Sequence, residues 1–543
     1  MRNRQYLIIL YVMNATEIRT REDLPADHNK LLSYSWNLTL SYQQLIEKYR
    51  KLLGSQFGRS SEKLSEQSDL DALQTEMDDL LKQLEAAKES QDDKDATEEI
   101  EVTTHKRRRK KHGRNSIPAE LITDVTIDLS EEDKKCGNCG NQLQQFDVKK
   151  HLVVDRIPAK YTATRYLQPV YGCPCCKDGV TAKEMPVVTP IPKGLAAAAL
   201  LVFVLTSKYQ YHLPLYRIQR QIFHESRIWF TRSTLCTWVG QCCGLLERIY
   251  KALLLQYRLS KIKHADETRV MVKVNGKLKE CWMWTGLTGD GRTGVFLYNR
   301  HRSGTAAKLL LEGSSPGDYL MIDDCPSYNK PIKDYHLTML RCMAHIRRKF
   351  VDAQKAGSRH EYCGKILIKI GQLYRLERFA TKKQYTVEQR TELRKTLSCR
   401  VLDEIKAMLI DPGFSPLPQS LVGNAINYFL KNWDAAVRYC EWGALPIDNT
   451  ADERINRPFT IGRNNWGQAG SESGARWMGC LYTIITTCKL NNINPEEYLN
   501  EVMMLLAVRP ENADITDLLP VNWYRKNNGG KDPVHTPLYP SKH

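Results

Sequence analysis

The hydrophobic pattern near the start of the chain is helical. Apolar residues recur at spacings of four and three through residues 38–53, and the spacing resumes over residues 70–87 after a break at Gly54 and Gly58. Charged residues flank this a/d seam, which is the pattern of a coiled coil. We therefore predict a coiled coil over residues 38–90 that joins copies of the chain. A single amphipathic helix folded back on its own domain is the alternative.

A second helical pattern runs from residue 191 to residue 257. It predicts a buried helix over residues 195–209, an amphipathic helix over residues 213–225, and a third helix that Thr231 or Ser233 caps. Three helices with a short turn before the third resemble a helix-turn-helix, although a plain helical connector explains the pattern equally well. If DNA lies here, its phosphates would contact three arginines: Arg217, Arg220 and Arg232.

Beyond Ser260 the apolar period becomes that of β-strands. The pattern predicts three strands, at residues 264–276, 280–289 and 293–302. A crossover helix at residues 305–313 and a fourth strand at residues 318–324 follow them. An RNase H-like mixed sheet begins with this order of elements. Asp266 would lie on the first strand and Asp323 at the end of the fourth, which would place the two carboxylates side by side.

A Lys- and Arg-containing helical stretch then separates Asp323 from a later acidic residue, Glu453. We interpret residues 346–442 as an all-helical insertion in a core that is split between residues 258–345 and 443–490. An independent helical domain without a role in the active site is the alternative.

These patterns predict a multidomain α/β protein with a coiled coil, a zinc ribbon, a helical segment similar to a helix-turn-helix, and the split RNase H-like core. The remaining predicted segments are an unassigned leader (1–37), a linker with a basic segment (91–118), a zinc-binding domain (119–190), the helical domain (191–257) and a C-terminal segment (491–543).

Composition adds an electrostatic argument. The 543-residue chain has 79 Lys and Arg against 62 Asp and Glu, which gives a formal net charge of +17 and favours a polyanionic partner. No apolar run approaches the roughly 20 residues that a membrane span requires, and residues 6–13 lack the cleavage site of a signal peptide. We therefore expect a cytoplasmic, DNA-associated protein with no membrane partner.

The positive charge is densest directly after the acidic, aperiodic linker. Seven of the ten residues from 105 to 114 are Lys or Arg, enough to neutralise several phosphates without regard to base sequence. A solvated basic linker is the alternative. The predicted DNA-contacting side chains are Lys106, Arg107, Arg108, Arg109, Lys110, Lys111 and Arg114.

Two cysteine pairs predict a structural zinc site. Cys136 and Cys139 form the first C-x2-C pair, Cys173 and Cys176 form the second, and 33 residues lie between the pairs. Four thiolates on two turns complete a tetrahedral zinc shell, and the long separation suits a zinc ribbon with an extended hairpin. Because Cys175 stands next to Cys176, either thiol could be the fourth ligand. Free buried cysteines are the alternative to a metal site.

Several sequence motifs resemble those of one protein family. They are HADET (264–268), CMAHIRRKF (342–350), IDNTADERINRP (447–458), IGRNNWGQAGSESGA (461–475) and TTCKLNNINPEEYL (486–499). In this order they resemble the TnpC-type transposases of the insertion-sequence-66 family, and the resemblance extends from about Leu45 to about Trp523. Such enzymes are similar to the wider group with an RNase H-like core and an Asp-Asp-Glu triad.

The resemblance implies which acids carry the reaction. Asp266, Asp323 and Glu453 match the family's triad, whereas the neighbouring Asp324 and Asp452 depart from the family's pattern. Successive side chains of a strand point to opposite faces, so Asp323 and Asp324 cannot both enter one site. By the same alternation, Glu267 beside Asp266 should face away from the site. Asp452 would add a further negative charge close to the metals.

The implied activity is metal-dependent DNA transposition. The three acids would bind two magnesium (or manganese) ions, water would hydrolyse the phosphodiester at the end of the element, and the released 3′ hydroxyl would attack target DNA. The partners would be double-stranded DNA of the element ends and of the target, a second copy of the chain, and companion proteins of the same element. The implied substrate-binding residues are His345, Arg347, Arg348, Arg454, Arg457, Arg463 and Trp466.

Each of these substrate contacts has a structural alternative. His345 can be a positioning residue, the arginines can form a solvated helix face, and Trp466 can be buried in the core instead of stacking on a base. Two other functions also fit the chain. One is a metal-dependent DNA nuclease that cuts without joining, and the other is a zinc-containing DNA-binding regulator that has lost catalysis.

Overall fold

The computed structural model describes residues 160–165, 170–172, 180–182, 189–192, 194–355, 361–413 and 416–535. The predicted leader, coiled coil, basic segment and zinc cysteines lie outside these residues. Two short strands, β1 (Val170–Gly172) and β2 (Val180–Ala182), pair antiparallel and flank the second cysteine pair in the sequence. Zinc, the coiled coil and the basic DNA contact therefore stay predictions.

A five-stranded mixed sheet forms the centre of the described structure. Its strands are β3 (Ile262–Val274), β4 (Lys277–Thr288), β5 (Gly294–Asn299), β6 (Tyr319–Ile322) and β7 (Thr338–Arg341). The spatial order is β5-β4-β3-β6-β7, in which β4 is antiparallel to β3 and β5, while β6 is parallel to β3 and β7. The predicted succession of three strands, a helix and a fourth strand is present, and β7 is an additional strand.

Local sequence explains the long hairpin of β3 and β4. Val274 pairs with Lys277, and the two residues between them, Asn275 and Gly276, have φ angles of 50° and 78°. A two-residue hairpin turn with positive φ at both positions favours the Asn-Gly pair, because its twist matches that of the strands. The turn thereby sets the register in which the apolar side of β3 faces the core.

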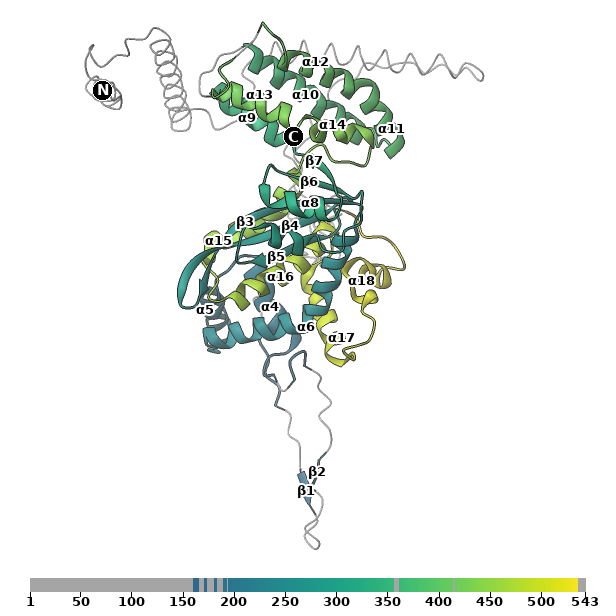
Figure 1. Cartoon of the computed structure of the whole chain (residues 1–543). Helices are drawn as coiled ribbons and strands as arrows, with labels where there is room; N and C mark the ends of the chain where they lie inside the picture. The colour runs from purple at the N-terminus through teal and green to yellow at the C-terminus, as the bar shows by residue number, and fades with distance from the viewer. Residues whose placement is uncertain are drawn as a thin grey trace, which may run out of the picture. The chain divides into compact units, whose positions relative to one another are not determined.

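Helices cover both faces of this sheet (Figure 1). On one face lies a cluster that contains Ala265, Trp284 and Leu320 from the strands. Its helices and 3-10 turn are α7 (Gly304–Leu310), η3 (Pro326–Tyr328) and α8 (Asn329–Asp334). The connections between β5, β6 and β7 thus also bury the first face of the sheet.

The opposite face packs against α15 (Thr450–Trp466) and α16 (Glu472–Leu490). Helix α16 in turn packs against α17 (Pro495–Val508) and α18 (Pro520–Asn527), and the 3-10 turn η6 (Thr516–Leu518) precedes α18. Helix α16 lies along β5, where the Phe296 amide donates a hydrogen bond of 2.9 Å to the Thr483 hydroxyl. Val270 and Val272 of β3 belong to the same apolar cluster as these helices.

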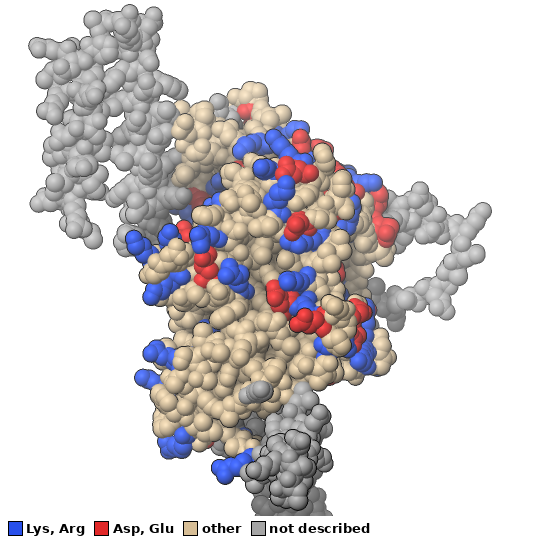
Figure 2. Space-filling view, turned by 60° about the horizontal axis from the view of Figure 1, so that its bottom comes forward, with Lys and Arg blue, Asp and Glu red and all other residues tan. Residues whose placement is uncertain are grey.

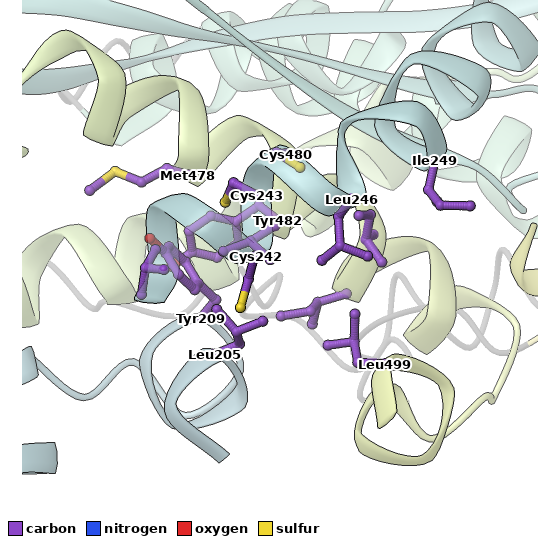
Figure 3. Packing of buried hydrophobic residues seen from close by; sticks show 14 of the residues in the cluster. Leu205, Tyr209, Cys242, Cys243, Leu246, Ile249, Met478, Cys480, Tyr482 and Leu499 are labelled. Atoms are coloured by element: carbon purple, nitrogen blue, oxygen red, sulfur yellow. The ribbon is translucent and has the colours of Figure 1, made fainter. Parts of the chain in front are cut away.

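The predicted trio of helices precedes the sheet. They are α4 (Ala198–Tyr209), α5 (Leu215–Ser226) and α6 (Arg232–Leu259). Thr231, one of the two predicted caps, accepts a hydrogen bond of 3.1 Å from the Thr234 amide at the start of α6. Tyr209 of α4, Cys242 of α6 and Tyr482 of α16 meet in one buried cluster (Figure 3). The trio is therefore packed onto the same core as the sheet.

The stretch between β7 and α15 is helical, as predicted. It contains α9 (Met343–Lys355), α10 (Glu361–Lys382), α11 (Val387–Leu393), the π-helix η4 (Arg394–Ser398), α12 (Cys399–Leu409), α13 (Leu421–Lys431), α14 (Trp433–Val437) and the 3-10 turn η5 (Arg438–Glu441). Its apolar core includes Met321 and Leu340 of the sheet, so these helices pack against β6 and β7. Buried Arg394 holds the helices together through Glu377, at 2.7 Å.

The cysteines of the described region are all free thiols. Across the described residues, every helix falls short of the length and apolar character needed to cross a membrane.

The packing of Gly286 generates a stability prediction. A Cβ atom at this position of β4 would lie 2.4 Å from Cζ of Tyr257, a buried ring of α6. We expect Gly286→Ala to destabilise the protein by about 1–3 kcal/mol, because overpacking in a core forces neighbouring atoms to move. The melting temperature of the purified protein measures the effect.

Gly244→Ala is the matched control. Apart from its chain neighbours and the nearby backbone of its own helix, no atom of the described residues lies within 4 Å of a Cβ at Gly244, which is exposed on α6. Alanine should therefore stabilise this helix by roughly 0.5–1 kcal/mol. Equal melting temperatures for the two variants would contradict the described packing.

Candidate active site

Neighbouring parallel strands bring Asp266 and Asp323 together. His264 of β3 pairs with Met321 of β6. Asp266 and Asp323 each stand two residues further along, so they continue the same register on the same face. Asp323 directly follows the last residue of β6, where the chain leaves the sheet. The side-by-side arrangement expected from the sequence is thus present.

Glu453 reaches these strands from the first turn of α15. Between it and Asp323 lies the imidazole of His345, a residue of α9. Nδ1 of His345 is 2.9 Å from Oδ1 of Asp323 and 3.7 Å from Oε1 of Glu453. The side chains of Asp323, His345 and Glu453 are 30%, 21% and 32% exposed, so a ligand can approach them.

An arginine completes the exposed side of this group. Nη2 of Arg348 lies 3.9 Å from Oε2 of Glu453, and its Nη1 lies 3.3 Å from Nε2 of His345. Arg348 is one helical turn beyond His345 on α9, so both side chains project from one face of that helix. The site therefore combines acids from the sheet and α15 with basic groups from α9.

Crowded negative charge perturbs the protonation of Asp266. Burial, and next the charge of Asp323, raise the pKa of Asp266 to about 7. For His345, burial lowers the pKa, but the hydrogen-bond contact with Asp323 and its charge outweigh burial, so the pKa is raised. Both shifts describe a site in which negative charge is in excess and a cation is stabilised.

Side chains that the sequence argument missed hold Asp266 in place. Its Oδ2 accepts a hydrogen bond of 3.1 Å from the amide of Asn456, and its Oδ1 accepts one of 2.8 Å from the backbone of Glu267. Asn456 also donates to the hydroxyl of Thr285, at 3.1 Å. The i, i+3 spacing of Glu453 and Asn456 on one helix was the available signal for this residue.

Asp452 occupies a different environment from its neighbour Glu453. It is fully buried beneath the site, where its Oδ2 accepts a hydrogen bond of 2.8 Å from Thr285. Its other oxygen, Oδ1, has no hydrogen-bond partner among the residues that the structure describes. Burial, and next the charge of Asp266, raise the pKa of Asp452 well above its usual range. Burial thus favours the neutral form of this carboxyl.

The two other neighbouring acids point elsewhere. Asp324 forms ion pairs with Arg341 at 3.0 Å and with Lys431 at 3.7 Å. Glu267 contacts Arg302 at 2.6 Å and accepts a hydrogen bond of 3.0 Å from Tyr328. These partners account for both charges away from the site, in agreement with the alternation of side chains along a strand.

The remaining predicted contacts divide between surface and interior. Arg347 is half-buried on α9, whereas Arg454 is half-buried and Arg457 exposed on α15. Arg463 instead donates to the Thr268 hydroxyl at 3.0 Å and to the carbonyl of Arg269, which ties α15 to β3.

Trp466 lies at the end of α15. Its ring is half-buried and packs edge-on against Phe459 at a centroid distance of 5.9 Å. The ring thus packs against the edge of the apolar cluster and keeps part of its surface exposed.

The donor set fits a hard divalent cation. Oε1 of Glu453 is a buried oxygen that accepts no hydrogen bond from any described residue, and Oδ1 of Asp323 is a buried oxygen that has Nδ1 of His345 at 2.9 Å. Carboxylate oxygens are the ligands that magnesium and manganese prefer. Asp323, Cys342 and His345 also place ligand atoms within 4.8 Å of one another. Burial raises the pKa of the Cys342 thiol, which keeps it protonated and makes it a poor ligand.

Comparison with protein families gives three matches in chain order. A family model described as "Transposase IS66 family" matches residues 193–477, which is more than half of the chain. A model described as "Transposase C of IS166 homeodomain" matches residues 44–123, and one described as "IS66 C-terminal element" matches residues 483–521. The first match contains all four residues Asp266, Asp323, His345 and Glu453.

Curated relatives come from Sinorhizobium fredii (strain NBRC 101917 / NGR234). The chain is 25% identical over 504 residues to the uncharacterized protein y4hP, which covers 88% of each sequence. It is 27% identical over 416 residues to the uncharacterized protein y4jD, a match that covers 74% of this chain and 80% of that protein. The similarity to both proteins thus extends over most of their length.

The buried carboxyl of Asp452 generates a pH prediction. A group whose pKa is raised by folding binds its proton more tightly in the folded state. Its contribution to stability is therefore fully present below the pKa that the carboxyl has in the unfolded state. As the pH rises from that pKa to the pKa of the folded state, the contribution is lost by about 1.4 kcal/mol per pH unit. Asp452→Asn mimics the neutral carboxyl. We expect its melting temperature, measured in chelator, to fall less than that of the wild type between about pH 5 and pH 8.

Asp434→Asn provides the comparison, because Asp434 is exposed on α14. This variant should follow the wild-type dependence on pH. An Asp452→Asn protein that loses stability with rising pH as steeply as the wild type would refute the neutral state of this group.

Proposed function

Because the chain belongs to the IS66 family of transposases, we propose that it is the DNA transposase of an insertion sequence. In this proposal it binds the terminal inverted repeats, hydrolyses a phosphodiester at each end and transfers the released 3′ end to target DNA. The observation that carries the proposal is the convergence of Asp266, Asp323 and Glu453 around one exposed position beside His345. The order of strands supports an RNase H-like core of the Asp-Asp-Glu type.

The same three acids are the proposed metal ligands. Divalent magnesium or manganese, when bound, would supply the positive charge that stabilises the attacking and leaving oxygens of an in-line displacement. Asp266 contributes a carboxylate that Asn456 orients through its amide. Glu453 contributes a carboxylate from the first turn of α15, where the helix dipole favours negative charge.

Basic side chains around the acids suit a phosphodiester substrate. Arg348 is exposed beside Glu453, and Arg454 is the residue after Glu453 on α15. Guanidinium groups form bidentate hydrogen bonds with phosphate oxygens, so these two residues are proposed to hold the strand that is cut. His345 is proposed to position Asp323 and to stay close enough to contact the phosphate.

Binding of the element ends draws on segments known from the sequence alone. The proposal assigns sequence-independent phosphate contacts to the basic residues 105–114, and dimerisation to the coiled coil of residues 38–90. A zinc ion on Cys136, Cys139, Cys173 and Cys176 would stabilise the domain between them. The resemblance to the family also implies companion proteins of the same element as partners.

Replacement of Glu453 by Gln tests the catalytic assignment. The amide keeps the size of the side chain but removes the charge that would hold the metal, so cleavage should fall by roughly a hundredfold or more. Binding of the element end should survive. The measurement is cleavage of a labelled duplex that carries the element's own terminal repeat, in magnesium, together with its binding.

Asp324→Asn is the control, since Asp324 faces Arg341 and Lys431 rather than the site. Its cleavage activity should stay within about threefold of the wild type. Full activity of the Glu453→Gln protein, or loss of activity only in the Asp324→Asn protein, would overturn the assignment of the triad.

A further inference from the structure

The outward face of α15 carries no negative charge beyond the active site. From Arg454 to Ser471 the sequence contains no Asp or Glu. Arg457, Ile461 and Asn464 are exposed at spacings of four and three, which places them on one face of the helix. This face therefore leads away from Glu453 as a neutral to basic surface.

The far end of α15 joins α4 and the turn that follows it. The amide of Asn465 donates a hydrogen bond of 3.3 Å to the carbonyl of His212. Nζ of Lys208 lies 5.7 Å from the ring centroid of Trp466. Both segments also share one apolar core cluster. The far end of α15 thus lies beside the end of α4 and the turn that leads into α5.

Helix α5 presents arginines that aromatic rings hold at the surface. The guanidinium carbons of Arg217 and Arg220 lie 5.7 and 5.8 Å from the ring centroid of Tyr216, and all three side chains are exposed. Arg227 lies 5.8 Å from the ring of Phe223. Glu225, the only acidic residue in the α5 sequence, accepts a hydrogen bond of 3.0 Å from the Tyr161 hydroxyl.

Figure 2 shows the charge of this side of the molecule. The lower left of the described surface, which is the side that carries α5 in Figure 1, displays blue Lys and Arg side chains and almost no red. Red acidic side chains gather elsewhere on the same view. On this side the Lys and Arg side chains stand apart from one another on a surface that is otherwise mostly uncharged.

We propose that double-stranded DNA lies along one track that runs from the active site over α15 to α5. We define this α15–α5 track by Arg454, Arg457, Asn464, Lys208, Arg217 and Arg220. The inference rests on the proposed function, since the end of the duplex is placed at Glu453. A polyanion is the complementary occupant, because the track joins several basic side chains and α15 has no acidic residue beyond Glu453.

Helix geometry sets the position of the α5 contacts on the DNA. Glu453 and Trp466 are 13 residues apart on α15, a rise of about 20 Å at 1.5 Å per residue. Base pairs rise about 3.4 Å each, so this length corresponds to about six base pairs. Arg217 and Arg220 should therefore contact phosphates that lie beyond about the sixth base pair from the scissile phosphate.

The first test is the salt dependence of DNA binding by the full-length protein. Removing two phosphate contacts with Arg217→Ala and Arg220→Ala together should reduce the slope of log affinity against log salt by about 1.8 and weaken binding about tenfold or more. Fluorescence anisotropy with a labelled 40-base-pair duplex carrying the element's terminal repeat measures both quantities. The charge-preserving pair Arg217→Lys and Arg220→Lys should keep the wild-type slope.

Lys382→Ala with Lys383→Ala is the matched control, because it removes two exposed positive charges at the end of α10, away from the track. Its slope should equal that of the wild type. An unchanged slope in the Arg217 and Arg220 alanine variant would overturn the track and leave α5 to a protein partner, while the result with Glu453→Gln would stand. Failure of the wild type to bind the duplex would overturn both proposals.

Hydroxyl-radical footprinting on the same duplex locates the contact. The alanine variant should lose protection beyond about the sixth base pair from the scissile phosphate and retain protection next to it. Loss of protection next to the scissile phosphate, or evenly along the duplex, would contradict the track. A melting temperature equal to that of the wild type shows that the variant is folded.

Discussion

Repulsion among carboxyl groups is the interaction on which the arrangement of the core depends. Asp266, Asp323 and Glu453 converge where β3 and β6 lie side by side, and Asp452 is buried directly beneath them. Burial and mutual charge raise the pKa of Asp266 to about 7 and raise the pKa of Asp452 well above its usual range. Such a group is stable only where the surrounding fold fixes its members and a cation offsets their charge. His345 and Arg348 supply part of that positive charge from α9.

Helix α15 does most to fix this arrangement. Its first turn carries Glu453, its second turn carries Asn456, which donates to Asp266, and Arg463 ties the helix to β3. Its far end packs against α4 through Trp466. One helix therefore leads from the acids to the end of α4 and the turn before α5, and this connection is the structural basis for placing substrate DNA along its outer face.

The helical insertion has a direct part in the site as well. It begins with α9, the helix that carries His345 and Arg348, and its apolar core includes Met321 and Leu340 from the sheet. The geometry around Asp323 therefore depends on how these helices pack. An independent domain without contact to the core would not supply those side chains.

Sequence patterns predicted the parts of this arrangement that are local or periodic. Strand periodicity predicted the order of β3 to β6 and the proximity of Asp266 and Asp323, which the register of β3 and β6 bears out. Alternation predicted that Asp323 and Asp324 would separate, and Asp324 indeed pairs with Arg341. The strand β7 was missed because its sequence, TMLR, is neither alternating nor a continuous apolar run, whereas the equally short β6 is the apolar run YLMI.

Contacts between distant segments were beyond the sequence argument. Asn456 acts on Asp266 and Thr285, which lie 190 and 171 residues away. Arg463 similarly finds Thr268 of β3 as its partner. A guanidinium or an amide looks the same in the sequence whether it will face a phosphate or a strand, so only the fold distinguishes the two.

The most direct test of the central claim is strand joining. A labelled duplex that already ends in the element's free 3′ hydroxyl is incubated with target DNA, magnesium, and either wild-type protein or the Asp323→Asn variant. The account predicts joined product with the wild type and none with the variant, because Asp323 would help hold the metal that in-line displacement requires. Nicking of DNA by the wild type without any joined product would contradict transposition and identify the protein as a nuclease.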